Sequence, residues 1–178
     1  GNSKSGLDGT YYIKNKFSNL YLDVTNGAAA DGTNIQQYAY NGLDSQKFKL
    51  VSDGNGYYSI LTGASNYASG LDVNSGNTKD GTSIEQWNNW GGDMQKFEII
   101  EVSSGVYAIK TKSSGNNSCL DVYEWSTKNG GDVVQWNYWG GDCQLWYLEK
   151  VATPVKINST GNSKSGLDGT YYIKNKFS

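Results

Sequence analysis

Histidine is absent from this 178-residue chain, and proline occurs only once. Without histidine, the chain has no serine–histidine or cysteine–histidine nucleophile and no histidine-ligated zinc site. It also lacks a glycine-rich phosphate loop ahead of a helix, and no apolar run reaches the ~18 residues of a membrane-spanning helix. We therefore expect no cofactor, no metal and no membrane partner.

Charge is scarce as well. Charged residues make up 18% of the chain, and the net charge is -2 with an isoelectric point near 5.1. This balance offers no basic surface, so no nucleic-acid partner is expected. Glycine and aromatic residues are abundant instead, with 23 glycines, six tryptophans and fourteen tyrosines. Such a composition is typical of a turn-rich all-β protein with a polar but weakly charged surface.

The chain contains three copies of one pattern, spaced about 49 residues apart. Each copy has a Gly-x-Tyr-x-Ile segment, a Leu-Asp-Val tripeptide, a turn signal after that tripeptide, and a Gln-x-aromatic segment. The Leu-Asp-Val tripeptides are residues 22–24, 71–73 and 120–122, and the Gln-x-aromatic segments begin at Gln46, Gln95 and Gln144. The alternating apolar and polar residues between the turns predict four short strands per copy.

Three copies of four strands favour a β-trefoil over a propeller, since a propeller typically needs at least four blades to close. The predicted fold is all-β: a β-trefoil with three four-stranded repeats, or lobes, at about 9–50, 56–100 and 105–150, in one domain over residues 1–150. A trefoil has one shared core. Equivalent apolar residues of the lobes are assigned to it: Ile13, Ile60 and Ile109; Leu22, Leu71 and Leu120; Val24, Val73 and Val122; Phe48, Phe97 and Trp146; Leu50, Ile99 and Leu148.

The aspartates fall into two groups. Those in turns, Asp31, Asp44, Asp80 and Asp93, are expected to accept hydrogen bonds from their own backbone. Those of the Leu-Asp-Val tripeptides, Asp23, Asp72 and Asp121, sit between two apolar strand residues. A carboxylate repeated three times in the middle of a strand needs either a backbone partner or a ligand, and we favour a ligand.

The recurring Gln-x-Phe or Gln-x-Trp with an upstream aspartate resembles the ricin-B-type (QxW)3 lectins and the family 13 carbohydrate-binding modules of bacterial glycoside hydrolases. The resemblance covers residues 9 to about 150. It implies that Gln46, Gln95 and Gln144 open the fourth strand of each lobe, hold the backbone together and only secondarily reach a ligand.

Sugar recognition needs a carboxylate for vicinal hydroxyls, an aromatic ring for the C–H face, and an amide for a further hydroxyl. The family places these groups at the aspartate and at thirteen and fifteen residues beyond it. The resemblance therefore implies three sugar sites, made by Asp23, Gln36 and Tyr38 in lobe one, by Asp72, Glu85 and Trp87 in lobe two, and by Asp121 and Trp136 in lobe three. In lobe three the amide position is Val134, so one polar contact worth about 1 kcal/mol is missing there.

Further candidates depart from the family pattern. Asn41 and Asn89 are expected to contact the ligand from the turn before the fourth strand. In the same turn, Trp90 and Trp139 are either pocket walls or structural lids. Trp125 replaces a glycine of the other lobes, and is either a substitute platform for the sugar or a packing residue.

The resemblance implies a non-catalytic module that binds plant cell-wall polysaccharide containing galactose, arabinose or xylose, and so targets an appended glycoside hydrolase. The alternatives are a free-standing galactose-type lectin and a trefoil that binds or inhibits proteins. A glycosidase is disfavoured, because the acidic residues are spread over three lobes instead of converging on one cleft. A glycan target favours a secreted, extracellular protein. Cys119 and Cys143, which the family would bring together near the lobe-three site, form a disulfide or remain two buried thiols.

Residues 161–178 repeat residues 1–18 without a difference, after a segment at 151–160 that is expected to be a linker. The lobes have diverged widely, so this repeat is distinct from the trefoil repeat. It reads as the start of a tandem module, natural or engineered, or as a second copy of the first strand that exchanges between molecules.

Overall fold

In the computed structural model, residues 6–152 are described, and they form twelve short strands joined by turns. The strands are β1 (Gly9–Asn15), β2 (Tyr21–Val24), β3 (Ile35–Tyr38), β4 (Phe48–Ser52), β5 (Tyr58–Thr62), β6 (Ser69–Val73), β7 (Thr82–Asn88), β8 (Phe97–Ser103), β9 (Val106–Thr111), β10 (Ser118–Val122), β11 (Val133–Asn137) and β12 (Trp146–Lys150). Within this part of the chain, the helical segments are three-residue 3-10 turns: η1 (Thr25–Gly27), η2 (Asp44–Gln46), η3 (Gly63–Ser65), η4 (Asn74–Gly76), η5 (Asp93–Gln95), η6 (Lys112–Ser114), η7 (Tyr123–Trp125) and η8 (Asp142–Gln144). None of these segments is long and apolar enough to cross a membrane.

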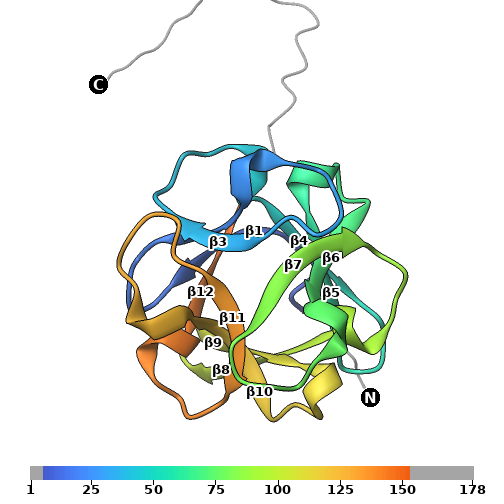
Figure 1. The fold of residues 1–178 in the computed structure, drawn as a ribbon, viewed down its shortest axis with the longest axis vertical. Coiled ribbons are helices and arrows are strands. Elements are labelled where there is room, and N and C mark those ends of the chain that lie inside the picture. The colour runs from blue at the N-terminus through green and yellow to red at the C-terminus, as the bar shows by residue number, and fades with distance from the viewer. Residues whose placement is uncertain (1–5, 153–178) are drawn as a thin grey trace, which may run out of the picture.

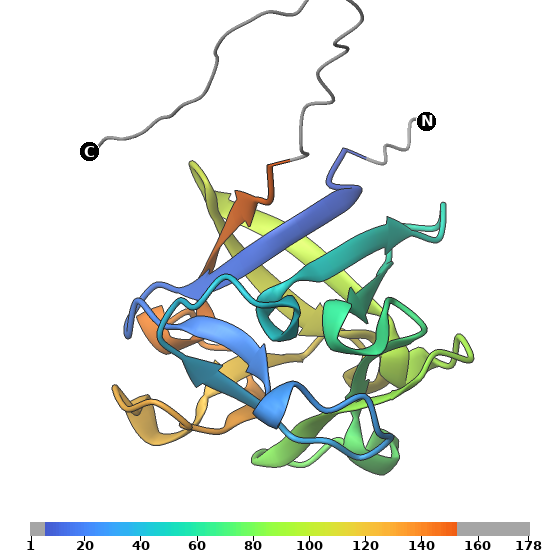
Figure 2. The ribbon, with the colours of Figure 1, turned by 90° about the horizontal axis from the view of Figure 1, so that it is seen from above.

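Six strands close into a barrel. Antiparallel pairing runs around the ring β1–β4–β5–β8–β9–β12 and back to β1. The remaining strands form three hairpins, β2–β3, β6–β7 and β10–β11, one from each lobe. Figure 1 shows the threefold arrangement of the lobes, and Figure 2 shows the hairpins gathered on one side of the barrel. The predicted β-trefoil of three four-stranded lobes is confirmed.

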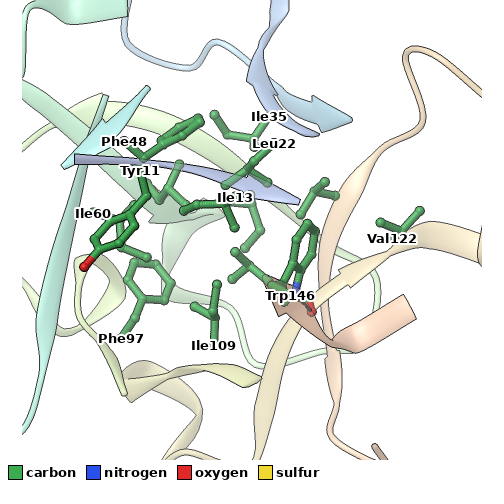
Figure 3. Close-up of a cluster of buried hydrophobic side chains, with 14 of the residues drawn as sticks. Tyr11, Ile13, Leu22, Ile35, Phe48, Ile60, Phe97, Ile109, Val122 and Trp146 are labelled. Carbon is green, nitrogen blue, oxygen red and sulfur yellow. Dashed lines mark hydrogen bonds between the residues drawn. The ribbon is translucent and has the colours of Figure 1, made fainter. Parts of the chain in front are cut away.

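The main hydrophobic core contains residues from all three lobes, and a small second cluster of Val106, Ala108 and Leu145 lies in lobe three. Ile13, Ile60 and Ile109 come from equivalent barrel strands and are fully buried. Phe48, Phe97 and Trp146 meet them from the first position of the fourth strand of each lobe (Figure 3). The Trp146 indole keeps a polar partner, since its Nε1 donates to the Leu120 carbonyl at 3.3 Å. Of the assigned core residues, only Ile99 and Leu148 are partly buried.

The turn after each hairpin's first strand reaches into the following lobe. Gly32, Gly81 and Gly130 adopt φ of +87°, +90° and +88°, a left-handed backbone that favours glycine. From the sequence, the aspartates before Gly32 and Gly81 were expected to bond the backbone of their own turns, and this prediction is wrong. Instead, Asp31 Oδ1 accepts from the Asn88 amide of lobe two at 2.7 Å, and Asp80 Oδ1 accepts from the Asn137 amide of lobe three at 2.8 Å.

The same correction applies to the aspartates that open η2 and η5. Asp44 forms an ion pair with Lys47, and Asp93 forms one with Lys112. A side-chain ion pair or a bond to another lobe is therefore recorded at all four turn aspartates in place of the expected local backbone bond. For Asp31, Asp80 and Asp93 the partner is distant in the chain, so turn composition alone does not reveal it.

A second set of glutamines, Gln37, Gln86 and Gln135, joins the lobes and was not singled out from the sequence. All three are fully buried. Gln86 Nε2 donates to the carbonyls of Ala28 and Ala30 in lobe one, at 2.9 and 3.0 Å. Its Oε1 accepts from the Thr62 hydroxyl at 2.6 Å. Each hairpin is thus fastened both to its own lobe and to the preceding one.

Within residues 6–152, lobe one holds β1 to β4, lobe two β5 to β8 and lobe three β9 to β12. The expected linker at 151–160 enters the described part of the chain only at Val151 and Ala152, and the duplicate at 161–178 lies outside it.

Replacement of Gln86 by alanine is expected to lower the free energy of unfolding by about 3 kcal/mol, because it removes two hydrogen bonds to part-buried carbonyls and one to a buried hydroxyl, and opens a cavity. Gln36→Ala is the matched control, since Gln36 is half-buried and makes one long hydrogen bond of 3.3 Å. The control should cost less than about 1 kcal/mol. Urea unfolding of both variants measures the difference, and equal losses would show that Gln86 does not join the lobes.

Candidate functional site

Each lobe carries one pocket where its hairpin meets the 3-10 turn before its fourth strand. The pockets have volumes of about 560 Å³ in lobe one, 350 Å³ in lobe two and 270 Å³ in lobe three. Every one of them is lined by the aspartate of the Leu-Asp-Val tripeptide and by the aromatic residue fifteen positions later. Asp23, Asp72 and Asp121 therefore lie where the sequence placed them, with only 3–5% of each side chain exposed.

The thirteen-residue spacing is explained by strand register. In the β2–β3 hairpin, Asp23 is the cross-strand partner of Gln36. The same register pairs Asp72 with Glu85 and Asp121 with Val134. Directly opposed residues of an antiparallel pair share one face, so the two side chains enter the same pocket.

A buried glutamine donates a hydrogen bond to each pocket aspartate. Gln46 Nε2 donates to Asp23 Oδ2 and to the Ala39 carbonyl, both at 2.9 Å, while its Oε1 accepts from the Asn41 amide. Gln95 and Gln144 do the same for Asp72 and Asp121, at 2.9 and 2.8 Å. These glutamines are almost fully buried and line none of the three pockets. Their hydrogen bonds tie each pocket aspartate to the backbone of its own lobe, which is a structural role.

Lobe one contains the complete set of neutral polar groups. Gln36 Nε2 donates to Asp23 Oδ1 at 3.3 Å, so the carboxylate is held from two sides. Tyr38 is 40% exposed and offers its ring to the pocket. Asn41 also lines this pocket, with its Oδ1 accepting from the Leu43 amide. Burial raises the pKa of Asp23, and the two amide bonds oppose that shift.

Lobe two has the same plan with a second carboxyl group. Glu85 takes the position of Gln36 and faces Asp72, with Trp87 and Trp90 as the aromatic walls. Burial raises the pKa of Glu85 to about 7, and the charge of Asp72 and a hydrogen bond to it add to the shift. The pKa of Asp72 is raised too, chiefly by burial.

Lobe three is the most aromatic pocket. Its lining combines Asp121 and Glu124 with four aromatic rings, those of Tyr123, Trp125, Trp136 and Trp139. Val134 is buried and does not line the pocket, so the missing amide is not replaced. Burial raises the pKa of Asp121 to about 6.

The tryptophans whose role was open from the sequence all line pockets. Trp90 and Trp139 are about 60% exposed, at 60% and 58%, so they are walls and not lids. Each indole folds over its glycine turn, and a Cβ at Gly92 would collide with the Trp90 ring. Trp125 serves both functions: it lines the lobe-three pocket and also packs edge-on against Phe17, with ring centroids 4.7 Å apart.

Asn89 was expected to contact the ligand, but it lines none of the three pockets, and its Oδ1 is buried without a hydrogen-bond partner. The sequence left Cys119 and Cys143 open between a disulfide and two buried thiols, and in the structure both are free and buried. The Cys143 thiol instead lies 3.9 Å from Asp121 Oδ2 and lines the lobe-three pocket.

Sequence reasoning missed the 3-10 turn that follows each Leu-Asp-Val tripeptide. Asn26, Ser75 and Glu124 occupy equivalent positions in these turns, adopt φ of +57°, +57° and +55°, and line their pockets. The available signal was the fixed distance of these residues from the aspartate. Within residues 6–152, no cluster of three or more metal-ligating side chains occurs.

Comparison with known proteins agrees with this geometry. A family described as ricin-type β-trefoil lectin domain-like matches residues 3–87, 67–136 and 93–178. The chain belongs to this family. The ricin-type lectin fold indicates carbohydrate binding, and domains of this type are generally non-catalytic.

Several solved structures resemble this ricin-type domain. A designed threefold-symmetric protein, ThreeFoil, is 37% identical with a TM-score of 0.76, over 81% of this chain and 100% of that one. An exo-β-1,3-galactanase from Clostridium thermocellum, 1,3Gal43A, is 34% identical with a TM-score of 0.76, over 80% of this chain and 30% of the enzyme. The agglutinin of Rhizoctonia solani is 26% identical with a TM-score of 0.70, over 84% of this chain and 100% of that one.

One curated relative matches a shorter segment. The clotting factor G alpha subunit of Tachypleus tridentatus is 41% identical over 56 residues, which is 32% of this chain. The match spans only 8% of the length of that protein.

The paired carboxyl groups of lobe two predict a pH-dependent effect of Glu85→Gln on the melting temperature (Tm). The pKa of Glu85, about 7, lies above its ordinary value of 4.5. The stability that protonated Glu85 contributes is therefore present below about pH 4.5 and is lost as the pH rises through about 7. Glutamine keeps the hydrogen bond at every pH, so the Tm advantage of the variant should be larger at about pH 8 than at about pH 4.

Thermal unfolding followed by circular dichroism measures this difference. Glu98→Gln, on β8 and outside the pockets, removes the same charge and serves as the control. An advantage of Glu85→Gln that is the same at both pH values, or that Glu98→Gln reproduces, would contradict the assignment.

Proposed function

We propose that this domain is a multivalent, non-catalytic carbohydrate-binding module that holds an appended glycoside hydrolase on plant cell-wall polysaccharide containing galactose, arabinose or xylose. The observation that carries the proposal is the repeated pocket, in which an aspartate almost fully buried but facing the pocket stands beside an exposed aromatic ring. That combination fits the vicinal hydroxyls and the C–H face of a pyranose. The similarity to part of an exo-β-1,3-galactanase supports attachment to such an enzyme and hence an extracellular location.

A free-standing lectin is the second candidate. It is favoured by the agglutinin of Rhizoctonia solani, which this chain covers completely. The pockets would serve either protein in the same way, so the difference lies in the target and the attached domain. A protein-binding or inhibitory trefoil fits less well, because it does not require an aspartate and an aromatic ring in every lobe.

Asp23→Ala and Asp72→Ala are each expected to remove one binding site and to leave the fold intact, since Gln46 and Gln95 each keep a backbone carbonyl partner. Binding to a panel of xylan, arabinan and galactan, followed by calorimetry, counts the sites. The wild-type domain should bind branched polymer more than about tenfold tighter than a monosaccharide, because separated sites raise the effective concentration.

The double variant should lose most of this gain, with circular dichroism as the control for folding. Unchanged capacity in the double variant would place the sites elsewhere. A complete absence of binding to the panel and to a glycan array would favour the protein-binding alternative.

We also propose that the repeated terminal sequence leads to strand exchange between molecules. β1 occupies the only position in the ring between β12 and β4, and it buries Tyr11, Ile13 and Asn15. Residues 169–178 carry the same side chains as residues 9–18 and so suit the same position. Light scattering should detect dimers or larger species of the full chain, but only monomers of a chain ending at Thr160. Two monodisperse monomers would exclude exchange.

A further inference from the structure

The lobe-two pocket differs from the lobe-one pocket at the position that decides its charge. In lobe one, Gln36 Nε2 donates a hydrogen bond to Asp23 Oδ1 at 3.3 Å, so this carboxylate oxygen already has one donor. Glu85 occupies the same register opposite Asp72. An ionised Glu85 has no proton to donate, so two carboxylates then face each other in one pocket.

The surroundings of this pair supply no cation. Asn74, Ser75, Trp87, Trp90 and Met94 complete the pocket lining, which includes no lysine. Asp31, on the lobe-one turn that reaches over β7, adds negative charge near both carboxyl groups. The neighbouring Lys112 is already paired with Asp93, at 3.2 Å.

Asp72 leaves one oxygen for a ligand. Its side chain is only 3% exposed, and its Oδ2 accepts from Gln95 Nε2 at 2.9 Å. Apart from a protonated Glu85, no described donor bonds its Oδ1, the oxygen that Gln36 reaches in the equivalent position of lobe one. A group with several N–H donors and a positive charge suits the space between Asp72 Oδ1 and Glu85.

We propose that the lobe-two pocket selects a sugar carrying a protonated primary amine, with Glu85 as the residue that determines this specificity. The inference rests on the proposed function, because it assumes that the pocket holds a sugar. An ammonium group has three donors for the two carboxylates and no acceptor that they would repel. Trp87 and Trp90 line the same pocket, and an ammonium group over the face of either ring gains cation–π attraction. In lobe one the amide of Gln36 stands opposite the aspartate, and the second carboxylate of the pocket, Asp44, is paired with Lys47 at 3.3 Å, so this pocket retains a preference for neutral sugars.

This arrangement gives the two kinds of ligand opposite pH dependences. With a pKa of about 7, Glu85 is largely protonated below neutral pH, and protonated Glu85 has the shape and donor of Gln36. Neutral sugars should then bind best at low pH. A cationic sugar requires the ionised pair, so its affinity should rise by about tenfold from about pH 5.5 to about pH 7 as Glu85 loses its proton.

The test uses the full chain and the indole N–H signals of its tryptophans in nuclear magnetic resonance spectra. Trp87 and Trp90 report on lobe two alone, while lobe one has Tyr38 and lobe three has its own tryptophans. The probes are methyl glycosides of galactose and glucose, their 2-amino-2-deoxy forms, and the neutral N-acetyl forms of those amines. Single replacement of Trp87 or Trp90 by phenylalanine assigns the signals.

At about pH 7, an amine probe should bind lobe two about tenfold tighter than its N-acetyl and hydroxyl counterparts. Glu85→Gln should abolish that preference and its pH dependence while keeping the neutral sugars bound. Glu98→Gln removes the same charge outside the pockets and should change neither. The inference is overturned if no amine exceeds its neutral counterparts at Trp87 and Trp90, or if the preference survives in Glu85→Gln.

The two levels of the proposal fail differently. Neutral sugars that bind lobe one, with no amine preference in lobe two, would overturn only the role of Glu85. If no probe and no polysaccharide binds any of the three pockets, the proposed carbohydrate-binding function and the role of Glu85 are both overturned.

Discussion

The side-chain amide of Gln46, with its counterparts in the other lobes, is the contact on which each pocket depends. Its nitrogen donates to the pocket aspartate and its oxygen accepts from the turn that carries Asn41. One buried group therefore fixes the carboxylate and a pocket wall relative to each other. Because the amide is fully buried, loss of any of its bonds leaves an unsatisfied polar atom, which restricts the pair to one geometry.

Because the same aspartate–glutamine pair is present in every lobe, the other residues of the pockets can differ. The aspartate and its glutamine are the same in all lobes, but the opposing residue is Gln36, Glu85 or Val134. The group directly opposite the aspartate is therefore an amide in lobe one, a second carboxyl group in lobe two and an apolar side chain in lobe three. Since each hairpin is fastened to its neighbour by a separate buried glutamine, such as Gln86, a change at the rim leaves the trefoil itself in place.

The fold could be predicted almost completely from the sequence, and so could most of each site. Repetition made this possible, because three diverged copies show which positions are held by the shared core and which are free to vary. The spacing of thirteen residues between Asp23 and Gln36 corresponds to one hairpin register, which is a local property of the chain. The misassigned residues include those whose partners lie in another lobe, such as Asp31 with Asn88, and Asn89, whose side-chain oxygen is buried away from the pockets.

The sequence by itself determined the trefoil, its twelve strands and the three aspartate–aromatic pairs, because alternation, turn residues and hairpin spacing act over short distances. Only the tertiary structure decided that Gln46 lies beneath its pocket, that Trp125 packs on Phe17 from lobe one, and that the cysteines stay apart as thiols. It also decided that Asp72 and Glu85 share a buried environment, in which burial raises the pKa of both groups and the charge of Asp72 raises that of Glu85 further. Burial and proximity between distant segments set these properties, and neither is a function of residue order along the chain.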